Sequence, residues 1–185
     1  MPTYSQPARL IGNALPDFSL LGVDGLQYTS SHLKEAQALV VAFICNHCPY
    51  VKATLPRMNQ LAKEYGSRGV RFIAINSNDA VKYPEDSFVK MQEVAQEQAF
   101  TFPYLYDESQ QVARDFNAVC TPEFFAYGMS SGKLTLQYHG RLDDNWKDAQ
   151  AVTRQDLALA LDQILVGVQP DLDQKAAMGC SIKWR

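Results

Sequence analysis

The sequence has 185 residues, of which 46% are hydrophobic and 11% aromatic, and its formal net charge is -3. This length suits one compact domain, and the composition is that of a globular rather than a disordered chain. Lysine and arginine are scattered without a basic, aromatic-rich stripe, which argues against nucleic-acid binding. No apolar run approaches the roughly 20 residues that span a bilayer, and residues 1–20 lack the pattern of an export signal. We therefore expect a soluble, cytoplasmic protein without membrane or nucleic-acid partners.

The N-terminal part of the chain predicts a β-ribbon, a buried strand and a helix. Short extended segments at 18–20 and 26–29 flank an Asp-Gly turn, which is a hairpin signal. Residues 38–45, ALVVAFIC, form a continuous apolar run rich in branched side chains, as in a strand covered on both faces. From Pro49 to Tyr65 apolar residues recur every three or four positions, which predicts a helix.

The middle of the chain continues the alternation of strands and helices. A second buried strand is expected at 69–76 and a helix from about Pro84. The next extended piece, FPYLYD, ends at Asp107. Asp107 and Gln110 have the spacing of an N-cap and its N3 partner, which predicts a helix around 112–116.

The C-terminal part predicts an antiparallel hairpin, a helix and a tail. The segments TPEFFAYG and KLTLQYHG are typical of two strands joined by a glycine-containing loop. Thr153 and Asp156 mark the start of a last helix. This order of elements indicates an α/β fold, in which strands joined by helical crossovers precede an antiparallel hairpin. We expect a single domain with its core at about 10–168 and a tail at 169–185.

The segment FICNHCPYV places Cys45 and Cys48 three residues apart at the junction between a strand and a helix. A CxxC pair at such a junction is typical of redox-active thiols. Unpaired backbone N–H groups and the positive end of the helix dipole favour thiolate over thiol there. We expect Cys45 to lie in the first turn as the exposed nucleophile and Cys48 to close the disulfide from inside. His47 would stabilise the thiolate further, and Pro49 suits an early helical position.

Two other uses of the four cysteines stay open at this stage. The pair could be buried thiols without chemistry. Alternatively, zinc ligands could come from Cys45, His47, Cys48, Cys120 and Cys180. Structural zinc sites normally use two close pairs of ligands, whereas Cys120 and Cys180 are isolated in the sequence, so we expect no metal and no other cofactor.

The CxxC junction and the later segment VCTPEFF together resemble the thioredoxin fold, in which a Thr-Pro with a cis peptide bond packs beside the CxxC. The resemblance implies that Thr121 and Pro122 fill these positions. A cis proline exposes the backbone of the residue before it, which can pair with an incoming disulfide-bearing chain as a short β-bridge. Cys120 would then lie close to the CxxC pair.

The wider order of motifs is similar to that of the AhpC/TSA (peroxiredoxin-like, redoxin) family. The motifs are LPDFSLLGVDG, ALVVAFICNHCPYV, GVRFIAINSND and FPYLYDESQQVARDFNAVCTPEFFAY. The resemblance implies a thioredoxin-like fold with an N-terminal β-ribbon extension and a C-terminal tail. It places Cys48 and Pro49 at the peroxidatic Cys-Pro position of the family. Cys45 then stands where the family has a Thr or Ser hydroxyl, and Val41 where it has a proline.

The active-site arginine of the family would fall near Thr121 and Pro122, and no arginine stands there. In the family, the missing hydroxyl and guanidinium polarise the peroxide bond, so these departures favour disulfide exchange over peroxide reduction. Cys180 lies on a tail that resembles the C-terminal resolving arm of some peroxiredoxins. Cys120 and Cys180 are therefore candidates for auxiliary or resolving thiols.

From the residues and the resemblance we expect an oxidoreductase of antioxidant, peroxiredoxin-like ancestry that cycles a Cys45/Cys48 dithiol and disulfide. Its partners would be a protein or small-molecule disulfide, or a hydroperoxide, together with a thioredoxin-type reductant. One alternative is a thiol peroxidase with Cys48 peroxidatic and Cys45 or Cys180 resolving. Another is a non-catalytic redox sensor or zinc-binding module. Which of Cys45 and Cys48 leads the attack stays open.

Overall fold

The computed structural model describes residues 1–7 and 10–185. Its strands are β1 (Thr3–Tyr4), β2 (Ser19–Gly22), β3 (Gln27–Thr29), β4 (Ala38–Phe43), β5 (Val70–Asn76), β6 (Tyr104–Tyr106), β7 (Cys120–Thr121), β8 (Glu123–Ser130), β9 (Lys133–Gly140) and β10 (Met178–Ser181). Its α-helices are α1 (Ser30–Leu33), α2 (Pro49–Gly66), α3 (Phe88–Glu97), α4 (Gln111–Asp115) and α5 (Asp156–Leu165). No helix in this part of the chain is long and apolar enough to cross a membrane.

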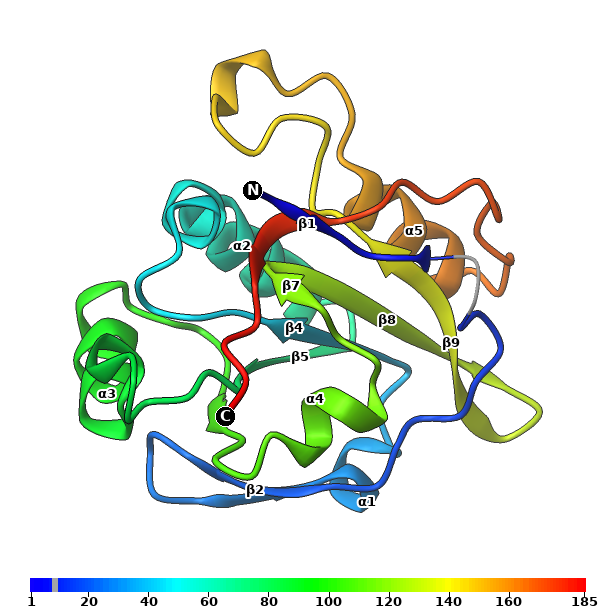
Figure 1. The fold of residues 1–185 in the computed structure, drawn as a ribbon. Coiled ribbons are helices and arrows are strands. Elements are labelled where there is room, and N and C mark those ends of the chain that lie inside the picture. Colours follow the sequence, from blue (N-terminus) through cyan, green and yellow to red (C-terminus); the bar gives the residue numbers. More distant parts are fainter. Residues whose placement is uncertain (8–9) are drawn as a thin grey trace.

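A seven-stranded sheet in the order β3-β2-β6-β5-β4-β8-β9 forms the centre of the molecule (Figure 1). The pairs β4–β5 and β5–β6 are parallel, whereas β8 pairs antiparallel with β4 and with β9. The β2–β3 ribbon extends the sheet on the β6 side. The predicted α/β class, the N-terminal ribbon and the C-terminal hairpin are therefore confirmed.

Helices cover both faces of the sheet, and β4 at its centre shows how the core is divided. Side chains alternate between the two faces of a strand, and all six residues of β4 are buried. Val40 and Ala42 belong to the core that contains α2 and α5, with Met91 of α3. Val41 and Phe43 belong to the opposite core, which contains the residues of α4. This two-sided burial explains the uninterrupted apolar run in the sequence.

Two helices begin later than the sequence predicted. The helix expected from about Pro84 begins at Phe88, because a short 3-10 helix precedes it. The last helix begins at Asp156 rather than at Thr153. Thr153 lies outside it because its backbone N–H and hydroxyl both bond to the side chain of Asp144.

Asp107 is not the cap of the following helix, because the N-cap of α4 is Gln110. The Asp107 carboxylate instead accepts hydrogen bonds from the Ser77 hydroxyl at 2.8 Å and from the Ala113 N–H at 2.9 Å. It is fully buried and links the end of β6 to the residue after β5 and to α4.

The C-terminal tail is part of the fold rather than an appendage. β10 lies between β1 and β7 and pairs antiparallel with both (Figure 1). Beyond it, Ile182 is 3% exposed in the core beneath α4, and Trp184 lies under the Arg114 guanidinium with 4.5 Å between carbon and ring centroid. The segment predicted as a tail therefore contains a strand that completes a second sheet.

Candidate active site

The CxxC pair lies in the loop between β4 and α2, with Cys48 as the N-cap of the helix and Pro49 as its first residue. The backbone of Cys48 is extended, with φ -68 and ψ 123. Pro49 suits this place because the N–H that proline lacks would have no partner in the helix. Cys45 lies three residues before the cap. The expectation that Cys45 lies in the first helical turn is therefore wrong, and Cys48 is the cysteine at the helix N-terminus.

The two thiols of the pair differ in their tendency to ionise. The hydrogen bond with Cys45 is the largest of the effects that lower the pKa of Cys48 to about 5. The Cys180 thiol and the backbone N–H of Val51 add to this effect, while burial opposes it. The same hydrogen bond, burial and the charge of Asp86 raise the pKa of Cys45 above its ordinary value. These effects favour ionisation of Cys48 over ionisation of Cys45.

Neither sulfur of the pair is open to bulk solvent, so the predicted exposure of Cys45 is also wrong. Cys45 is 2% exposed and Cys48 0%. Both contact Thr121: the Cys45 Sγ lies 3.3 Å from its hydroxyl oxygen, and the Cys48 Sγ lies 3.2 Å from its carbonyl oxygen. The Thr121–Pro122 peptide bond is cis. The structure therefore brings together the CxxC pair and the cis proline, as the resemblance implied.

Cys180 reaches the site through strand pairing. In the β10–β7 ladder Cys180 is the partner of Thr121, and its Sγ lies 3.0 Å from the Cys48 Sγ. Burial and the hydrogen bond between Cys180 and Cys48 raise the pKa of Cys180 to about 12, so Cys180 is a thiol at neutral pH. Gly179 permits this approach, because a Cβ at that position would collide with the carbonyl of Thr121.

Cys120 is fully buried, and burial and the charge of Glu123 raise its pKa. Its Sγ lies 3.9 Å from the Ala177 carbonyl oxygen, which is a weak contact. The structure therefore places Cys120 next to the site as a packed, protonated thiol.

Glu123 supports the strand that carries the Thr-Pro, and sequence reasoning missed it. Its buried carboxylate accepts hydrogen bonds from the N–H groups of Val119 at 2.8 Å and Cys120 at 3.0 Å. Its other oxygen lies 2.6 Å from Nε2 of His139, which is also buried. The signal in the sequence was an acidic residue directly after a proline within an otherwise apolar strand.

Asp86 is a second buried carboxylate that the sequence did not reveal. It is fully buried and accepts hydrogen bonds from the Asn46 backbone N–H and the Asn78 side-chain amide, both at 2.7 Å. The Nδ1 atom of His47 lies 2.7 Å from it, and the His47 ring stacks on Tyr83 with centroids 5.6 Å apart. Asp86 therefore fixes the loop between the two cysteines.

One group of side chains in the described residues has the composition of a metal site. The ligand atoms of Cys45, His47 and Asp86 all lie within 4.8 Å of one another. A sulfur, an imidazole nitrogen and a carboxylate oxygen are ligands that zinc accepts. This set differs from the one considered from the sequence, because it includes Asp86 and leaves out Cys120 and Cys180. Both Asp86 oxygens already accept hydrogen bonds, whereas the buried Nδ1 atom of His47 has no hydrogen-bond partner among the described residues.

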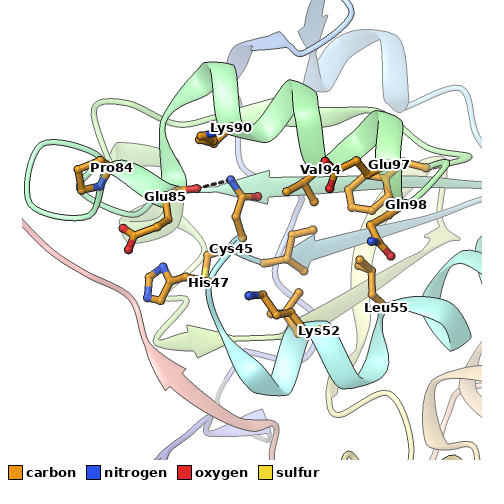
Figure 2. A pocket seen from close by; sticks show the side chains of 14 residues that line it. Cys45, His47, Lys52, Leu55, Pro84, Glu85, Lys90, Val94, Glu97 and Gln98 are labelled. Carbon is orange, nitrogen blue, oxygen red and sulfur yellow. Dashed lines mark hydrogen bonds between the residues drawn. The ribbon is translucent and has the colours of Figure 1, made fainter.

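A cavity of about 620 Å³ lies between α2 and α3 and reaches the CxxC loop (Figure 2). Cys45 and His47 line one end of it, and Glu97 and Gln98 line the other. The cavity therefore touches the pair at Cys45, whereas Cys180 contacts it at Cys48.

Comparison with known proteins identifies the family. The sequence matches the AhpC/TSA family over residues 11–136. The chain belongs to the AhpC/TSA family. Among curated proteins no significant sequence match was found.

Two solved structures are similar to this AhpC/TSA chain over its whole length. An uncharacterized conserved protein from Geobacillus kaustophilus is 42% identical, with a TM-score of 0.92, and the match covers 100% of this chain and 97% of that one. A hypothetical protein from Sinorhizobium meliloti 1021 is 35% identical, with a TM-score of 0.91, and the match covers 100% and 99%.

More distant structures define the fold. A secreted Mycobacterium tuberculosis disulfide oxidoreductase homologous to E. coli DsbE is 18% identical, with a TM-score of 0.59, over 78% of this chain and 94% of that one. A thiol:disulfide interchange protein of the thioredoxin family from Chlorobium tepidum is 21% identical, with a TM-score of 0.62, over 83% and 97%. The predicted thioredoxin-like fold and the predicted family are both confirmed.

Proposed function

We propose that the protein is a thiol-disulfide oxidoreductase in which Cys45 and Cys48 cycle between dithiol and disulfide. The observation that carries the proposal is the Cys45/Cys48 pair at the N-terminus of α2, whose two sulfurs both contact Thr121 next to Pro122. The fold shared with thiol:disulfide interchange proteins adds support. The partners we propose are a disulfide substrate and a thioredoxin-type reductant, in the cytoplasm.

The environment of each sulfur supports a different role in this proposal. Cys45 borders the cavity and forms the mixed disulfide with the substrate, after passing its proton to Cys48 through their hydrogen bond. The first substrate sulfur leaves as a thiolate and takes the proton from Cys48. The Cys48 thiolate then attacks the Cys45 sulfur and releases the second substrate sulfur as a thiolate. In the reverse direction Cys48 is the leaving group, and its low pKa makes it a good one. The stabilised thiolate also makes the disulfide easy to reduce.

Mass spectrometry of the cysteine pairing tests this proposal. After equilibration with mixtures of reduced and oxidised glutathione, the protein should hold a Cys45–Cys48 disulfide whose amount follows the buffer potential. Cys45→Ser and Cys48→Ser should each abolish that disulfide, whereas Cys120→Ala should retain it. A protein that never forms this bond, or that carries stoichiometric zinc when purified without chelator, is not the proposed enzyme.

A second function, a thiol peroxidase, is favoured by the 3.0 Å separation of Cys48 and Cys180. The Cys48 thiolate would attack a hydroperoxide, giving a sulfenic acid and an alcohol or water. The Cys180 thiol would then condense with the sulfenic acid, giving a disulfide and water. We rank this function second because the family's active-site arginine is missing near Thr121, and Arg141, which could replace it from another loop, is paired with Asp156 at 2.7 Å. The hydroxyl next to the pair, that of Thr121, contacts Cys45 rather than Cys48.

Stopped-flow mixing of the reduced protein with hydrogen peroxide separates the two functions. A peroxidase should consume peroxide in a second-order reaction and leave a Cys48–Cys180 disulfide. The Cys180→Ser variant should then over-oxidise at Cys48. A thiol-disulfide oxidoreductase should react with peroxide no faster than an ordinary protein thiolate, and its oxidised product should be the Cys45–Cys48 bond.

A further inference from the structure

The backbone edge next to the active-site pair is occupied by the chain itself. An extended polypeptide substrate would pair with the backbone of Thr121, but the β10 residue Cys180 already holds that position. β10 is in turn paired with β1, so neither side of β10 is free. A protein disulfide therefore meets the tail before it meets either sulfur.

The other approach to the pair is the cavity between α2 and α3, whose walls are mainly apolar. Its apolar lining residues are Ile44, Val51, Leu55, Pro84, Val94 and Phe100. Figure 2 shows Leu55 of α2 and Val94 of α3 on opposite sides, with Cys45 at one end. A volume of about 620 Å³ lies within the range of small-molecule sites, which runs from roughly 300 to 1,000 Å³.

The charged side chains of the cavity distinguish its two ends. Lys52, one turn into α2, lies at the end that contains Cys45 (Figure 2). Lys90 is already paired with Glu93 at 2.5 Å, whereas Lys52 has no ion-pair partner among the residues that the structure describes. Glu97 lies at the far end, where it disfavours a second negative charge. Glu85 lies beside His47 at the Cys45 end, so that end carries one charge of each sign, and a ligand carboxylate close to the sulfur fits only on its Lys52 side.

We infer that the cavity binds a low-molecular-weight thiol or disulfide with an apolar or aromatic body and one carboxylate near the sulfur. This inference rests on the proposed function and names its substrate class. The apolar body lies between Leu55 and Val94, the carboxylate faces Lys52, and the ligand sulfur meets the Cys45 Sγ. Leu55, Val94 and Lys52 are binding residues, and Cys45 is the sulfur that reacts.

The exchange balances without any further reactant. With the oxidised protein, the ligand thiolate attacks the Cys45 sulfur, a ligand–Cys45 disulfide forms, and Cys48 leaves as a thiolate. A second ligand thiolate attacks the ligand sulfur of that mixed disulfide, which releases the ligand disulfide and the Cys45 thiolate. The Cys45 thiolate then takes a proton. Two ligand thiols are oxidised, one protein disulfide is reduced, and the reverse reaction uses the same atoms.

The test uses aromatic disulfides as probes of the reduced protein, in a Cys180→Ser background so that the tail thiol does not contribute. The first probe, 5,5'-dithiobis(2-nitrobenzoate), carries a carboxylate on each ring. The second, 4,4'-dithiodipyridine, has a similar size and no charge at neutral pH. Stopped-flow absorbance gives the rate of thiol release for each probe. In a protein that also carries Cys48→Ser, mass spectrometry should locate the trapped probe on Cys45.

Three variants separate the contributions of shape and charge. Leu55→Trp and Val94→Phe reduce the cavity volume and should slow both probes by about tenfold or more. Lys52→Gln should slow the carboxylate probe by about threefold, the size of an exposed ion pair, and leave the neutral probe unchanged. The matched controls Leu159→Trp and Lys63→Gln change exposed residues of α5 and α2 that do not line the cavity, and they should react at the wild-type rate.

The possible failures are distinguishable. If the cavity variants react at the wild-type rate while the Cys45–Cys48 disulfide still forms in glutathione buffers, the cavity inference is wrong and the proposed function stands. If that disulfide never forms, the proposed function is wrong. A probe trapped on a cysteine other than Cys45 also overturns the inference. Because Lys52 is exposed, its variant should fold even if a larger side chain at Leu55 disturbs packing.

Discussion

The two flanks of the Cys48 sulfur are built in different ways. On the tail flank, Cys180 lies 3.0 Å away on a strand whose backbone pairs with Thr121. On the cavity flank, Cys45 separates the sulfur from a side-chain-lined hollow of about 620 Å³. Backbone pairing recognises any extended chain, whereas a shaped hollow selects by size and charge. In this chain the backbone edge at Thr121 is covered by β10, whereas the cavity between α2 and α3 is open.

The largest effect is expected for the ionisation of Cys48, whose sulfur lies between the tail flank and the cavity flank. In the reduced wild-type protein the ultraviolet absorbance of thiolate should titrate with a midpoint near the Cys48 pKa of about 5. Cys48→Ser should remove this titration completely, because burial still raises the pKa values of Cys45 and Cys180, and the charge of Asp86 adds to the effect on Cys45. A low-pH titration that survives in Cys48→Ser would assign the thiolate to another cysteine.

The same titration sets the pH dependence of stability of the reduced protein. The folded-state pKa of Cys48 lies below that of an unfolded thiol, which is about 8.5. Its contribution to stability is therefore fully present above the unfolded pKa and is lost as pH falls through about 5. Urea unfolding of the reduced wild-type protein should show this loss, and Cys48→Ser should not. Equal pH profiles for the two proteins would contradict the assignment.

The next effect concerns the support of the tail flank, where the carboxylate of Glu123 holds the backbone before Thr121. Glu123→Gln should lower the free energy of unfolding by about 3 kcal/mol, because it leaves the buried His139 and the two N–H groups with a poorer partner. Urea titration measures this change. Glu93→Gln is the matched control: it removes an exposed partner of Lys90 and should cost less than about 1 kcal/mol. Equal costs for the two variants would show that Glu123 has no special role.

The contrast between the flanks is tested most directly at Gly179. Gly179→Val should displace β10, because a Cβ there collides with the Thr121 carbonyl, and it should speed alkylation of Cys48 by about tenfold or more through local opening. Gly66→Ala is the matched control, since a Cβ at Gly66 meets nothing within 4 Å. Unchanged alkylation in Gly179→Val would mean that the tail does not shield Cys48.

Much of the frame around the junction could be predicted from the sequence. β4 was predicted correctly because a strand that is buried on both faces has an unbroken run of apolar residues. α2 was predicted correctly because a helix that is buried on one face has an apolar residue at every third or fourth position. The Thr121–Pro122 cis bond followed from the family resemblance rather than from periodicity. The catalytic roles of Cys45 and Cys48 remain predictions.

Features that depend on contacts distant in the sequence could not be predicted. Asp86 and Glu123 look like surface acids in the sequence, and only the folded structure places backbone N–H groups around them. β10 has the short sequence MGCS, which carries no strand pattern, and it forms because Thr121 offers a free edge. The assignment of Cys45 to the helix start was wrong because an apolar repeat does not mark the first residue of a helix. The helix begins at Pro49, and Cys48 is its N-cap.

The smallest effect is expected from His47 on the cavity flank, where Asp86 raises the pKa of Cys45 through its charge. The His47 Nδ1 atom lies 2.7 Å from Asp86, where a protonated ring would offset part of that charge. His47→Ala should therefore raise the midpoint of the Cys48 titration by about 0.5 and make the Cys45–Cys48 disulfide slightly harder to reduce. Glutathione equilibration measures the second change. In a double-mutant cycle, adding Asp86→Asn should return both quantities toward the wild-type values, because the unopposed charge is then gone. An unchanged reduction potential in His47→Ala would show that His47 has no effect on the pair. A shift that Asp86→Asn does not reverse would show that His47 acts on the sulfurs by a route other than this carboxylate.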